Sequence, residues 1–379
     1  TPLYSSAASD VYKRQLSYIN RHTISLSKLK NRFKIMKEYS NGDLKVSSFP
    51  NMIHIEPTNH CNLQCVMCPQ PRDMTRVKGT MELKMFKDII NELRNTPAEF
   101  VYLHQFGESL LVNDVYEMID YAEDANIRAG MSTNAVALNE KNTKRLLNSK
   151  LSFLTLSLDG GKQEIYDKFR PGDSWERVEK NVFKFLDLRK KMTNEKSPFV
   201  VVQTISMKGN ENSIQNLKNK FSDYNVIFSN KPFNDWGGKL DDINSLAIMD
   251  HSQDNKEIEK CEKPYKLLTI EWDGTVVPCT RFWDNQFTYG KFPEQTLREI
   301  WNSDKAQKFR AAHNKSRDGL SFCSTCSLDG PSPIESIGLR FLDIMFIEKL
   351  IAGIPLVRER KLTSFLEKFR GYRKKKLRP

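Results

Sequence analysis

The sequence of 379 residues predicts an α/β protein, in which a partial barrel of six strand–helix units is followed by a small cysteine-rich domain. Two observations lead to this prediction. Short apolar runs alternate with longer amphipathic runs from residue 52 to residue 233, as expected for strands and helices in turn. Beyond residue 260, a hairpin pattern and four of the seven cysteines replace this alternation.

Six apolar runs of strand length predict the strands of the barrel. They cover residues 52–58, 100–106, 127–134, 153–160, 199–206 and 225–233. The amphipathic runs between them predict helices over 81–95, 113–126, 139–150, 174–192 and 212–224. Asn113 and Ser174 are expected to begin two of these helices, because a short polar side chain can accept a hydrogen bond from a free N–H group of the first turn.

Strand–helix units in series imply a parallel sheet with right-handed crossovers, and six of them can form a partial (β/α)6 barrel of the TIM-like kind. Functional side chains in such a barrel gather at the C-terminal ends of the strands. This rule selects the cysteine loop after the first strand, "GES" after the second, "STN" at the end of the third and "DG" after the fourth.

Composition also indicates where one segment of the chain ends and the next begins. Residues 1–15 show no periodicity, and we expect them to be non-native sequence. The segment 267–279 predicts a hairpin that turns at Asp273–Gly274, and 297–314 predicts a helix. The predicted segments are an N-terminal extension 1–50, the barrel 51–233, a polar linker 234–260, the cysteine-rich domain 261–330 and an amphipathic basic tail 331–379.

The net charge of +12 is concentrated at the two ends of the chain. Residues 13–37 carry eight Lys or Arg and no acid, and residues 358–379 carry ten Lys or Arg against two Glu. The span between these ends is close to neutral, so we expect no nucleic-acid partner. Basic ends fit either solvated tails or contact with an anionic membrane surface.

The tail from Leu339 onward has apolar residues at near-helical spacing before the lysines at 374–376. Peripheral membrane contact through this tail is one expectation, and packing of its helix on the barrel is the alternative. The sequence shows no export signal and no run of about 20 apolar residues. A cytoplasmic location follows, with the tail at the inner face of the membrane if it binds there.

Three cysteines, Cys61, Cys65 and Cys68, lie in the loop after the first strand with the spacing C-x3-C-x2-C. An odd number of cysteines without an export signal argues against a disulfide framework. Structural zinc takes four protein ligands, whereas a [4Fe–4S] cluster with three thiolates keeps one iron open. The pattern favours the open cluster, and zinc completed by His54 or His60 is the alternative.

This cysteine loop, followed by "QFGES", "STN" and "SLDG" at later strand ends, resembles the radical S-adenosylmethionine (SAM) enzymes. The resemblance covers about residues 50–330. It implies a [4Fe–4S] cluster on Cys61, Cys65 and Cys68, whose open iron binds SAM and whose electron cleaves SAM to methionine and a 5′-deoxyadenosyl radical. The chain departs from the family's Gly-Gly-Glu-Pro motif at Phe106 and Ser109.

The same resemblance assigns roles to residues at the strand ends. The backbone of Met67 would lie beside the adenine, and Gly107 and Glu108 would receive the SAM amino group. Three short polar residues would contact the SAM carboxylate or ribose: Ser132, Asn134 and Ser157. Asp159 would lie near the substrate and is the candidate catalytic base, although short polar residues at strand ends are often only turn formers. Arg170 fits either a substrate contact or a surface ion pair.

The remaining cysteines have the pattern C-x17-C-x43-C-x2-C, formed by Cys261, Cys279, Cys323 and Cys326. Four thiolates could complete either a zinc site or a cubane cluster. Their surroundings resemble the SPASM/twitch extensions of the radical SAM enzymes, in a shortened form. The resemblance implies one auxiliary [4Fe–4S] cluster, and zinc stays open as the alternative.

A fully ligated auxiliary cluster has no open iron, so we expect it to accept an electron. Relatives of this kind include dehydrogenases of aminocyclitols, which favours oxidation of a small polyol, sugar or glycan-precursor substrate, with an electron donor such as flavodoxin or ferredoxin. The alternative is a peptide- or protein-modifying maturase, but about 35 residues before the first strand are few for a leader-binding domain. The non-enzyme alternative is an iron–sulfur or zinc binding protein.

Overall fold

The computed structural model describes residues 25–192, 197–233, 236, 245–246, 261–315, 320, 322–324 and 326. The predicted tail 331–379, with its apolar and lysine-rich stretches, lies outside these residues, as do residues 1–24 and most of the predicted linker. The prediction of membrane contact through the tail is therefore untested. No helix in the described part of the chain is both long and apolar enough to cross a membrane.

The strands form one nine-stranded sheet with the order β6-β5-β4-β3-β2-β1-β7-β8-β9. Their bounds are β1 Met52–Ile55, β2 Phe100–Leu103, β3 Arg128–Thr133, β4 Phe153–Ser157, β5 Phe199–Ser206, β6 Ile227–Pro232, β7 Leu267–Ile270, β8 Thr275–Val277 and β9 Gly290–Lys291. Strands β1 to β6 pair in parallel with their neighbours, which confirms the predicted barrel strands and their order.

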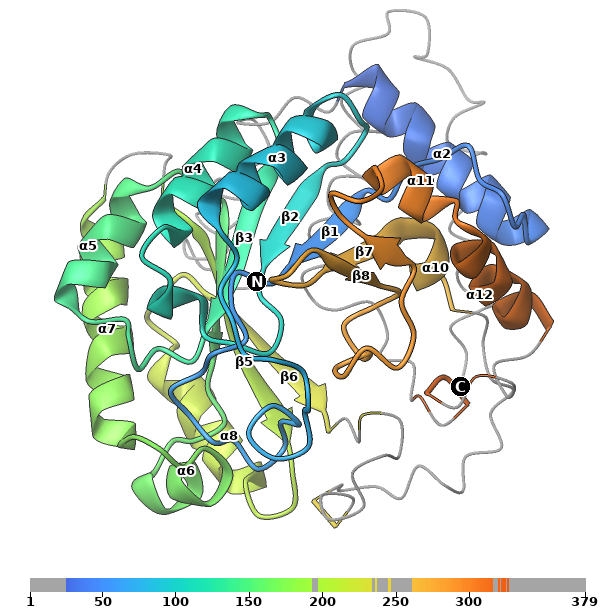
Figure 1. Cartoon of the computed structure of the whole chain (residues 1–379). Coiled ribbons are helices and arrows are strands. Elements are labelled where there is room, and N and C mark those ends of the chain that lie inside the picture. The colour runs from blue at the N-terminus through green and yellow to red at the C-terminus, as the bar shows by residue number, and fades with distance from the viewer. Residues whose placement is uncertain are drawn as a thin grey trace, which may run out of the picture. The chain divides into compact units, whose positions relative to one another are not determined.

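The hairpin of the cysteine-rich domain continues the barrel sheet. Strand β7 pairs in parallel with β1, with Met52 opposite Leu267 and Ile55 opposite Ile270, and β8 turns back antiparallel to β7 (Figure 1). The predicted hairpin is confirmed, but its loop spans residues 271–274 instead of the predicted two-residue turn. Because β1 carries the cysteine loop at its end, this pairing brings the two cysteine-bearing parts of the chain into one sheet.

The helices cover the outer side of the sheet (Figure 1). Their bounds are α2 Leu26–Asn41, α3 Leu83–Arg94, η1 Ser109–Leu111, α4 Val115–Asp124, α5 Glu140–Asn148, α6 Gln163–Phe169, α7 Trp175–Lys191, α8 Glu211–Lys220, α10 Lys263–Lys266, α11 Leu297–Trp301 and α12 Asp304–Lys315. Ser174 begins α7 as predicted, since its side chain accepts from Arg177 N. Asn113 does not begin α4, because the cap residue is Asp114.

Three features of the helices differ from the prediction. The short helix α6 was not predicted, and the predicted helix 297–314 is two helices, α11 and α12, separated at Asn302–Ser303. Helix α2 lies within the predicted extension and buries Asn31, Ile35 and Glu38. Asn31 exchanges two hydrogen bonds with the backbone of Phe49, at 2.8 and 2.9 Å. These bonds attach α2 to the segment that leads into β1.

Hydrogen bonds also connect the segment directly after α2 to the cysteine-rich domain. The buried Arg310 of α12 donates to the carbonyl of Leu44 at 2.9 Å, and Asn314 donates to the carbonyl of Gly42. Gly42 has a φ of 75°, and a Cβ there would lie within 2.9 Å of Asn314. Residues 26–50 thus pack as part of the unit that contains the barrel and the cysteine-rich domain.

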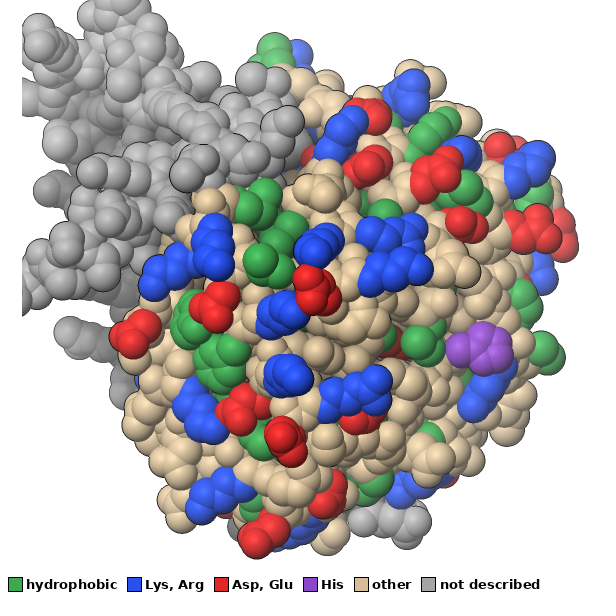
Figure 2. Space-filling view, turned by 90° about the vertical axis from the view of Figure 1, so that its left-hand side faces the viewer, with side chains coloured by type: hydrophobic (Ala, Val, Ile, Leu, Met, Phe, Trp, Pro, Cys, Tyr) green, Lys and Arg blue, Asp and Glu red, His purple; other side chains and the backbone are tan. Residues whose placement is uncertain are grey.

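Charged side chains of both signs are interspersed on the face that carries α5 and α7 (Figure 2). Glu140 of α5 pairs with Lys144 at 2.8 Å and with Lys184 of α7 at 2.5 Å. Water and salt screen exposed pairs of this kind, so they add little to stability.

Candidate active site

The loop that carries Cys61, Cys65 and Cys68 is held by backbone hydrogen bonds from several elements. Gln64 N and Val66 N donate to the carbonyls of Pro171 and Phe169, at 2.9 and 3.1 Å. On the opposite side, Glu108 N donates to the carbonyl of His60 at 2.9 Å. The loop is therefore positioned by the ends of β2 and α6, and the three thiols occupy defined places at the C-terminal edge of the sheet.

Burial raises the pKa of each of these thiols, and that of Cys65 reaches about 11 and that of Cys68 about 12. Two polar side chains point at the sulfur atoms. Asn134 Nδ2 lies 3.8 Å from the sulfur of Cys61, and Arg170 Nη1 lies 3.9 Å from that of Cys65. Thiols with raised pKa values bind iron only by releasing protons, and both donors favour the thiolate form.

The chemistry of this donor set fits a [4Fe–4S] cluster with one open iron. Three thiols on one loop would supply three ligands, and the amide and guanidinium donors face two of the sulfurs, as groups that support metal ligands do. Among the described residues, no group of three or more His, Cys, Asp or Glu side chains is arranged to hold a single metal ion.

Gly107 is required by close packing against the cysteine loop. A Cβ at this position would lie 2.1 Å from the carbonyl oxygen of Thr58 and 2.8 Å from that of His60. The family resemblance implies that Gly107, together with Glu108, receives the SAM amino group. The structure shows a further reason for glycine, because the two backbones meet here directly.

Glu108 is buried and holds the end of β3. Its carboxylate accepts from Thr133 Oγ1 at 2.8 Å, from Asn134 N at 2.7 Å and from Leu110 N at 3.1 Å. Burial nevertheless raises the pKa of Glu108, since desolvation outweighs these bonds. A carboxylate can accept about four hydrogen bonds, so roughly one position is left for a ligand.

The polar residues predicted at the ends of β3 and β4 come together. Ser132 Oγ and Ser157 Oγ are 2.9 Å apart. Asn134 Nδ2 donates to Asn62 Oδ1 at 2.8 Å, next to Cys61. The structure thus brings Glu108, Ser132, Asn134 and Ser157 to the same edge of the sheet as the cysteine loop, as the strand-end rule requires.

Asp159 is buried and paired with Arg170. Its Oδ2 accepts from Arg170 Nε at 2.8 Å and from Nη2 at 2.5 Å, and its Oδ1 accepts from Ile205 N at 2.6 Å. The ion pair is almost completely buried, so the surface salt bridge considered for Arg170 is wrong. Arg170 links Asp159 to the sulfur of Cys65, and the pair is part of the cysteine site.

An apolar cluster surrounds this site. Met67 is buried in it, and its carbonyl accepts from Trp236 Nε1 at 2.7 Å. The buried members of the cluster are Met67, Phe106, Phe169, Met207, Phe233 and Trp283. Cys65 and Cys68 pack against it, so two of the three thiols have apolar side chains on one side. Such surroundings limit the access of water to a bound group.

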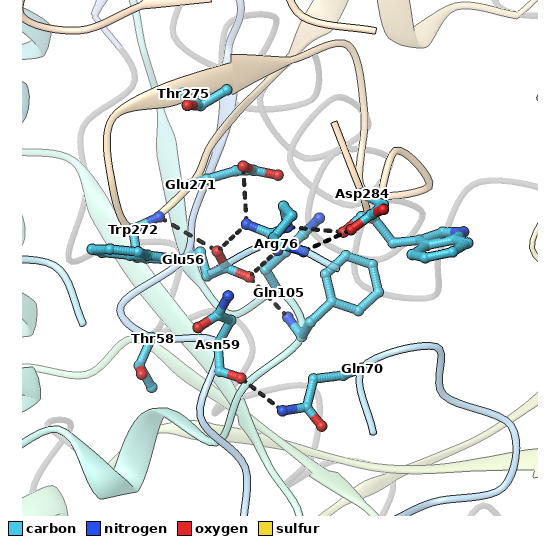
Figure 3. Close-up of polar contacts among 12 residues, drawn as sticks. Glu56, Thr58, Asn59, Gln70, Arg76, Gln105, Glu271, Trp272, Thr275 and Asp284 are labelled. Atoms are coloured by element: carbon cyan, nitrogen blue, oxygen red, sulfur yellow. Dashed lines mark hydrogen bonds and ion pairs between the residues drawn. The ribbon is translucent and has the colours of Figure 1, made fainter. Parts of the chain in front are cut away.

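A charged network joins the cysteine loop of the barrel to the hairpin of the second domain (Figure 3). Arg76 forms two hydrogen bonds to the carboxylate of Glu56, at 2.9 and 3.0 Å, and its Nη1 lies 2.9 Å from Glu271. Asp284 accepts from the backbone N–H groups of Thr75 and Arg76, at 2.6 and 2.9 Å. The charged side chains of Arg76, Glu56 and Glu271 are all buried.

The four cysteines of the second domain are also neighbours. Cys261 and Cys323 are buried, and Cys279 and Cys326 are partly buried. Burial raises the pKa of Cys261 to about 11, and its thiol interacts electrostatically with those of Cys279 and Cys326. Four thiols with no histidine among them would supply all four terminal ligands that an iron–sulfur cubane needs.

Sequence reasoning missed the residues that support these ligands. Glu56 and Glu271 each follow a strand, and the only signal was a carboxylate directly after an apolar run. Arg76 and Asp284 lie in loops, where no local pattern marks them. Their importance depends on the pairing of β1 with β7, which the sequence alone does not display.

Comparison with known proteins agrees with this arrangement. The family model of the Radical SAM superfamily matches residues 55–207, and that of the SPASM iron–sulfur cluster-binding domain matches residues 261–327. An S-adenosyl-L-methionine-dependent 2-deoxy-scyllo-inosamine dehydrogenase from Niallia circulans is 23% identical over 285 residues, which cover 73% of this chain and 92% of that protein.

Two further similarities concern proteins with other substrates. The mycofactocin maturase MftC of Mycobacterium ulcerans is 32% identical over 120 residues, which cover 32% of each chain. The crystal structure of Streptococcus suis SuiB bound to precursor peptide SuiA is similar with a TM-score of 0.55 and 18% identity, covering 75% of this chain and 71% of that one. At this identity the likeness to SuiB is one of fold.

Proposed function

The chain is a radical SAM iron–sulfur enzyme with a SPASM-type auxiliary domain, and we propose that it oxidises a secondary alcohol or a related C–H centre of a small polyol, sugar or glycan precursor. The observation that carries the proposal is the second cysteine set. Its four thiols would complete the ligation of an auxiliary cluster, which would then have no iron open to substrate and would serve as an electron acceptor.

The residues of the first site would hold the cofactors. Cys61, Cys65 and Cys68 would ligate the [4Fe–4S] cluster, and the free acceptor position of Glu108 would receive the SAM ammonium group. When bound, the cluster and SAM supply a 5′-deoxyadenosyl radical that can remove a hydrogen atom from an unactivated carbon. The apolar cluster around Met67 and Phe106 would keep water away from this chemistry.

Asp159 would hold the substrate hydroxyl and accept its proton. Three hydrogen bonds from Arg170 and Ile205 fix the carboxylate, and one of about four acceptor positions remains for a substrate. A general base must lie within hydrogen-bond reach of the proton that it takes. Loss of this proton and of one electron to the auxiliary cluster would convert the carbon-centred radical into a carbonyl group.

The experiment uses the anaerobically reconstituted enzyme with SAM, a reductant and candidate polyols deuterated at the carbon to be oxidised. We expect deuterium to appear in 5′-deoxyadenosine, with about one SAM consumed per product. Return of the label to product with regeneration of SAM would indicate an isomerase. Gain of hydrogen from solvent without oxidation would indicate an epimerase.

A peptide- or protein-modifying maturase is the second candidate. The similarity to a protein named mycofactocin maturase over 120 residues supports it, whereas the dehydrogenase matches over 285 residues. Turnover of peptides, with no oxidation of any polyol, would decide for the maturase and against the first proposal.

A further inference from the structure

Tyr289 is fixed in the auxiliary domain by its backbone and by its ring. It directly precedes β9, and its N–H donates to the carbonyl of Val276 at 2.7 Å while its carbonyl accepts from Ser303 Oγ at 3.1 Å. The ring packs edge-on against Phe287 and Phe309, with interplanar angles of 88° and 75°. The side chain is 1% exposed, so the direction of its hydroxyl group is determined by packing.

This hydroxyl group is buried and has no hydrogen-bond partner within the described residues. An unpaired buried O–H group is unfavourable, and native proteins seldom leave one without a partner. The unpaired donor therefore requires an acceptor that the described residues around it do not supply without a bound group.

The neighbours of the hydroxyl identify that acceptor. It interacts electrostatically with the thiols of Cys279, Cys261 and Cys323, which are three of the four auxiliary cysteines, and with Arg310. Arg310 is occupied by the carbonyls of Pro264, Leu44 and Trp301 and has no acceptor atom. Among these neighbours only sulfur can accept a hydrogen bond, and none of the cysteine sulfurs accepts one from this hydroxyl in the structure. The acceptor would therefore be a sulfur of the bound cluster, in the space between the hydroxyl and the thiols.

We propose that the Tyr289 hydroxyl group donates a hydrogen bond to a sulfur of the auxiliary iron–sulfur cluster and raises its reduction potential. A donor facing a cluster sulfur stabilises the more negative, reduced state more than the oxidised state. The charge of Arg310 acts in the same direction. Tyr289 is thus a positioning residue for the electron-accepting role of the cluster, and the inference holds for any substrate of the enzyme.

Tyr265 provides a matched control in the same domain. Its side chain is also fully buried and near Arg310, with 5.8 Å between the guanidinium carbon and its ring. Its hydroxyl group, however, is 3.1 Å from Asn314 Oδ1 and therefore has a protein partner. Loss of this hydroxyl removes a structural hydrogen bond without removing a donor to the cluster.

The test compares Tyr289→Phe and Tyr265→Phe in the anaerobically reconstituted full chain. A variant with Cys61, Cys65 and Cys68 replaced by Ala assigns the auxiliary signal in a redox titration followed by electron paramagnetic resonance. We expect Tyr289→Phe to move the auxiliary midpoint potential to a more negative value and to remove an exchangeable proton coupled to the reduced cluster. Tyr265→Phe should lower the melting temperature and leave both readouts unchanged.

An unchanged potential in Tyr289→Phe at full iron content would overturn the proposal, and so would persistence of the coupled proton. If this variant fails to assemble the cluster, 3,5-difluorotyrosine at position 289 retains the shape and is a stronger donor. At a pH where its hydroxyl stays protonated, the auxiliary potential should become more positive. No shift in that protein would equally overturn the proposal.

Discussion

The guanidinium of Arg76 lies 2.9 Å from the carboxylate of Glu271 while it is hydrogen-bonded to Glu56. One cation thus faces two buried carboxylates, one at the end of the barrel strand β1 and one after the auxiliary strand β7. A buried pair of carboxylates with one cation retains an uncompensated negative charge, and low polarity makes such a charge unfavourable. The junction between the barrel and the auxiliary domain is therefore sensitive to protonation.

We predict that Glu271→Gln changes the pH dependence of stability. Burial, with a further contribution from the negative charge of Glu56, raises the pKa of Glu271 to about 8. In the unfolded chain the pKa of a Glu is about 4.3. The stabilisation from the bound proton is complete below the unfolded pKa and is lost as the pH rises through about 8. Between pH 5 and pH 9 the wild type should lose on the order of 2–5 kcal/mol relative to the variant, which cannot ionise.

Urea unfolding of both proteins across this pH range measures the difference. Parallel stability curves for wild type and variant would contradict the raised pKa. Glu117→Gln, at an exposed position of α4, is the control and should run parallel to the wild type.

We predict that Arg170→Ala destabilises the chain without cofactors by about 3–5 kcal/mol, because it leaves the buried Asp159 carboxylate without its cation. The double variant Asp159→Asn, Arg170→Gln removes both charges and should regain most of this loss. Denaturant unfolding under two-state conditions measures both. Equal losses in the single and double variants would mean that packing, and not charge, holds this position.

We predict that Glu108→Gln weakens SAM binding about tenfold to a hundredfold, which corresponds to a loss of roughly 1.5–3 kcal/mol. A neutral amide loses the charge-assisted bond to the ammonium group, and its NH2 group would also oppose Asn134 N–H. Isothermal titration of the iron-loaded protein with SAM measures the affinity, and the iron content should not change. A stability loss with unchanged affinity would limit Glu108 to supporting the end of β3.

We predict about eight iron atoms per anaerobically reconstituted chain, from two cubane clusters. The division of the seven cysteines into three and four gives this value. Metal analysis would show about four iron atoms and one zinc if the auxiliary site were a zinc site, and the proposed electron transfer would then fail.

We predict separate losses from two cysteine substitutions. Cys65→Ala should abolish SAM cleavage, because it removes a ligand of the SAM-binding cluster. Cys323→Ala should retain cleavage and stop substrate turnover, because only the electron acceptor is lost. Chromatography of 5′-deoxyadenosine and product separates these outcomes. Unfolding of Cys323→Ala, seen by circular dichroism, would show that the auxiliary metal is needed for folding.

The sequence by itself determined the strand–helix order, the positions of the barrel strands along the chain and the two cysteine sets. These features are encoded locally. Periodicity distinguishes a strand such as 199–206 from a helix such as 174–192, and three thiols within one loop remain together in any fold. The strand-end rule then predicts that Glu108, Ser132 and Asn134 lie beside the cysteine loop.

The tertiary structure alone decided how these parts meet. Pairing of β1 with β7 joins segments more than 200 residues apart in the sequence and brings Arg76 between Glu56 and Glu271. The partners of Asp159 and the unpaired hydroxyl of Tyr289 likewise depend on side chains from distant elements. A local pattern reports which face of an element is apolar, whereas burial and pairing of a polar group depend on the complete set of neighbours that folding brings to it.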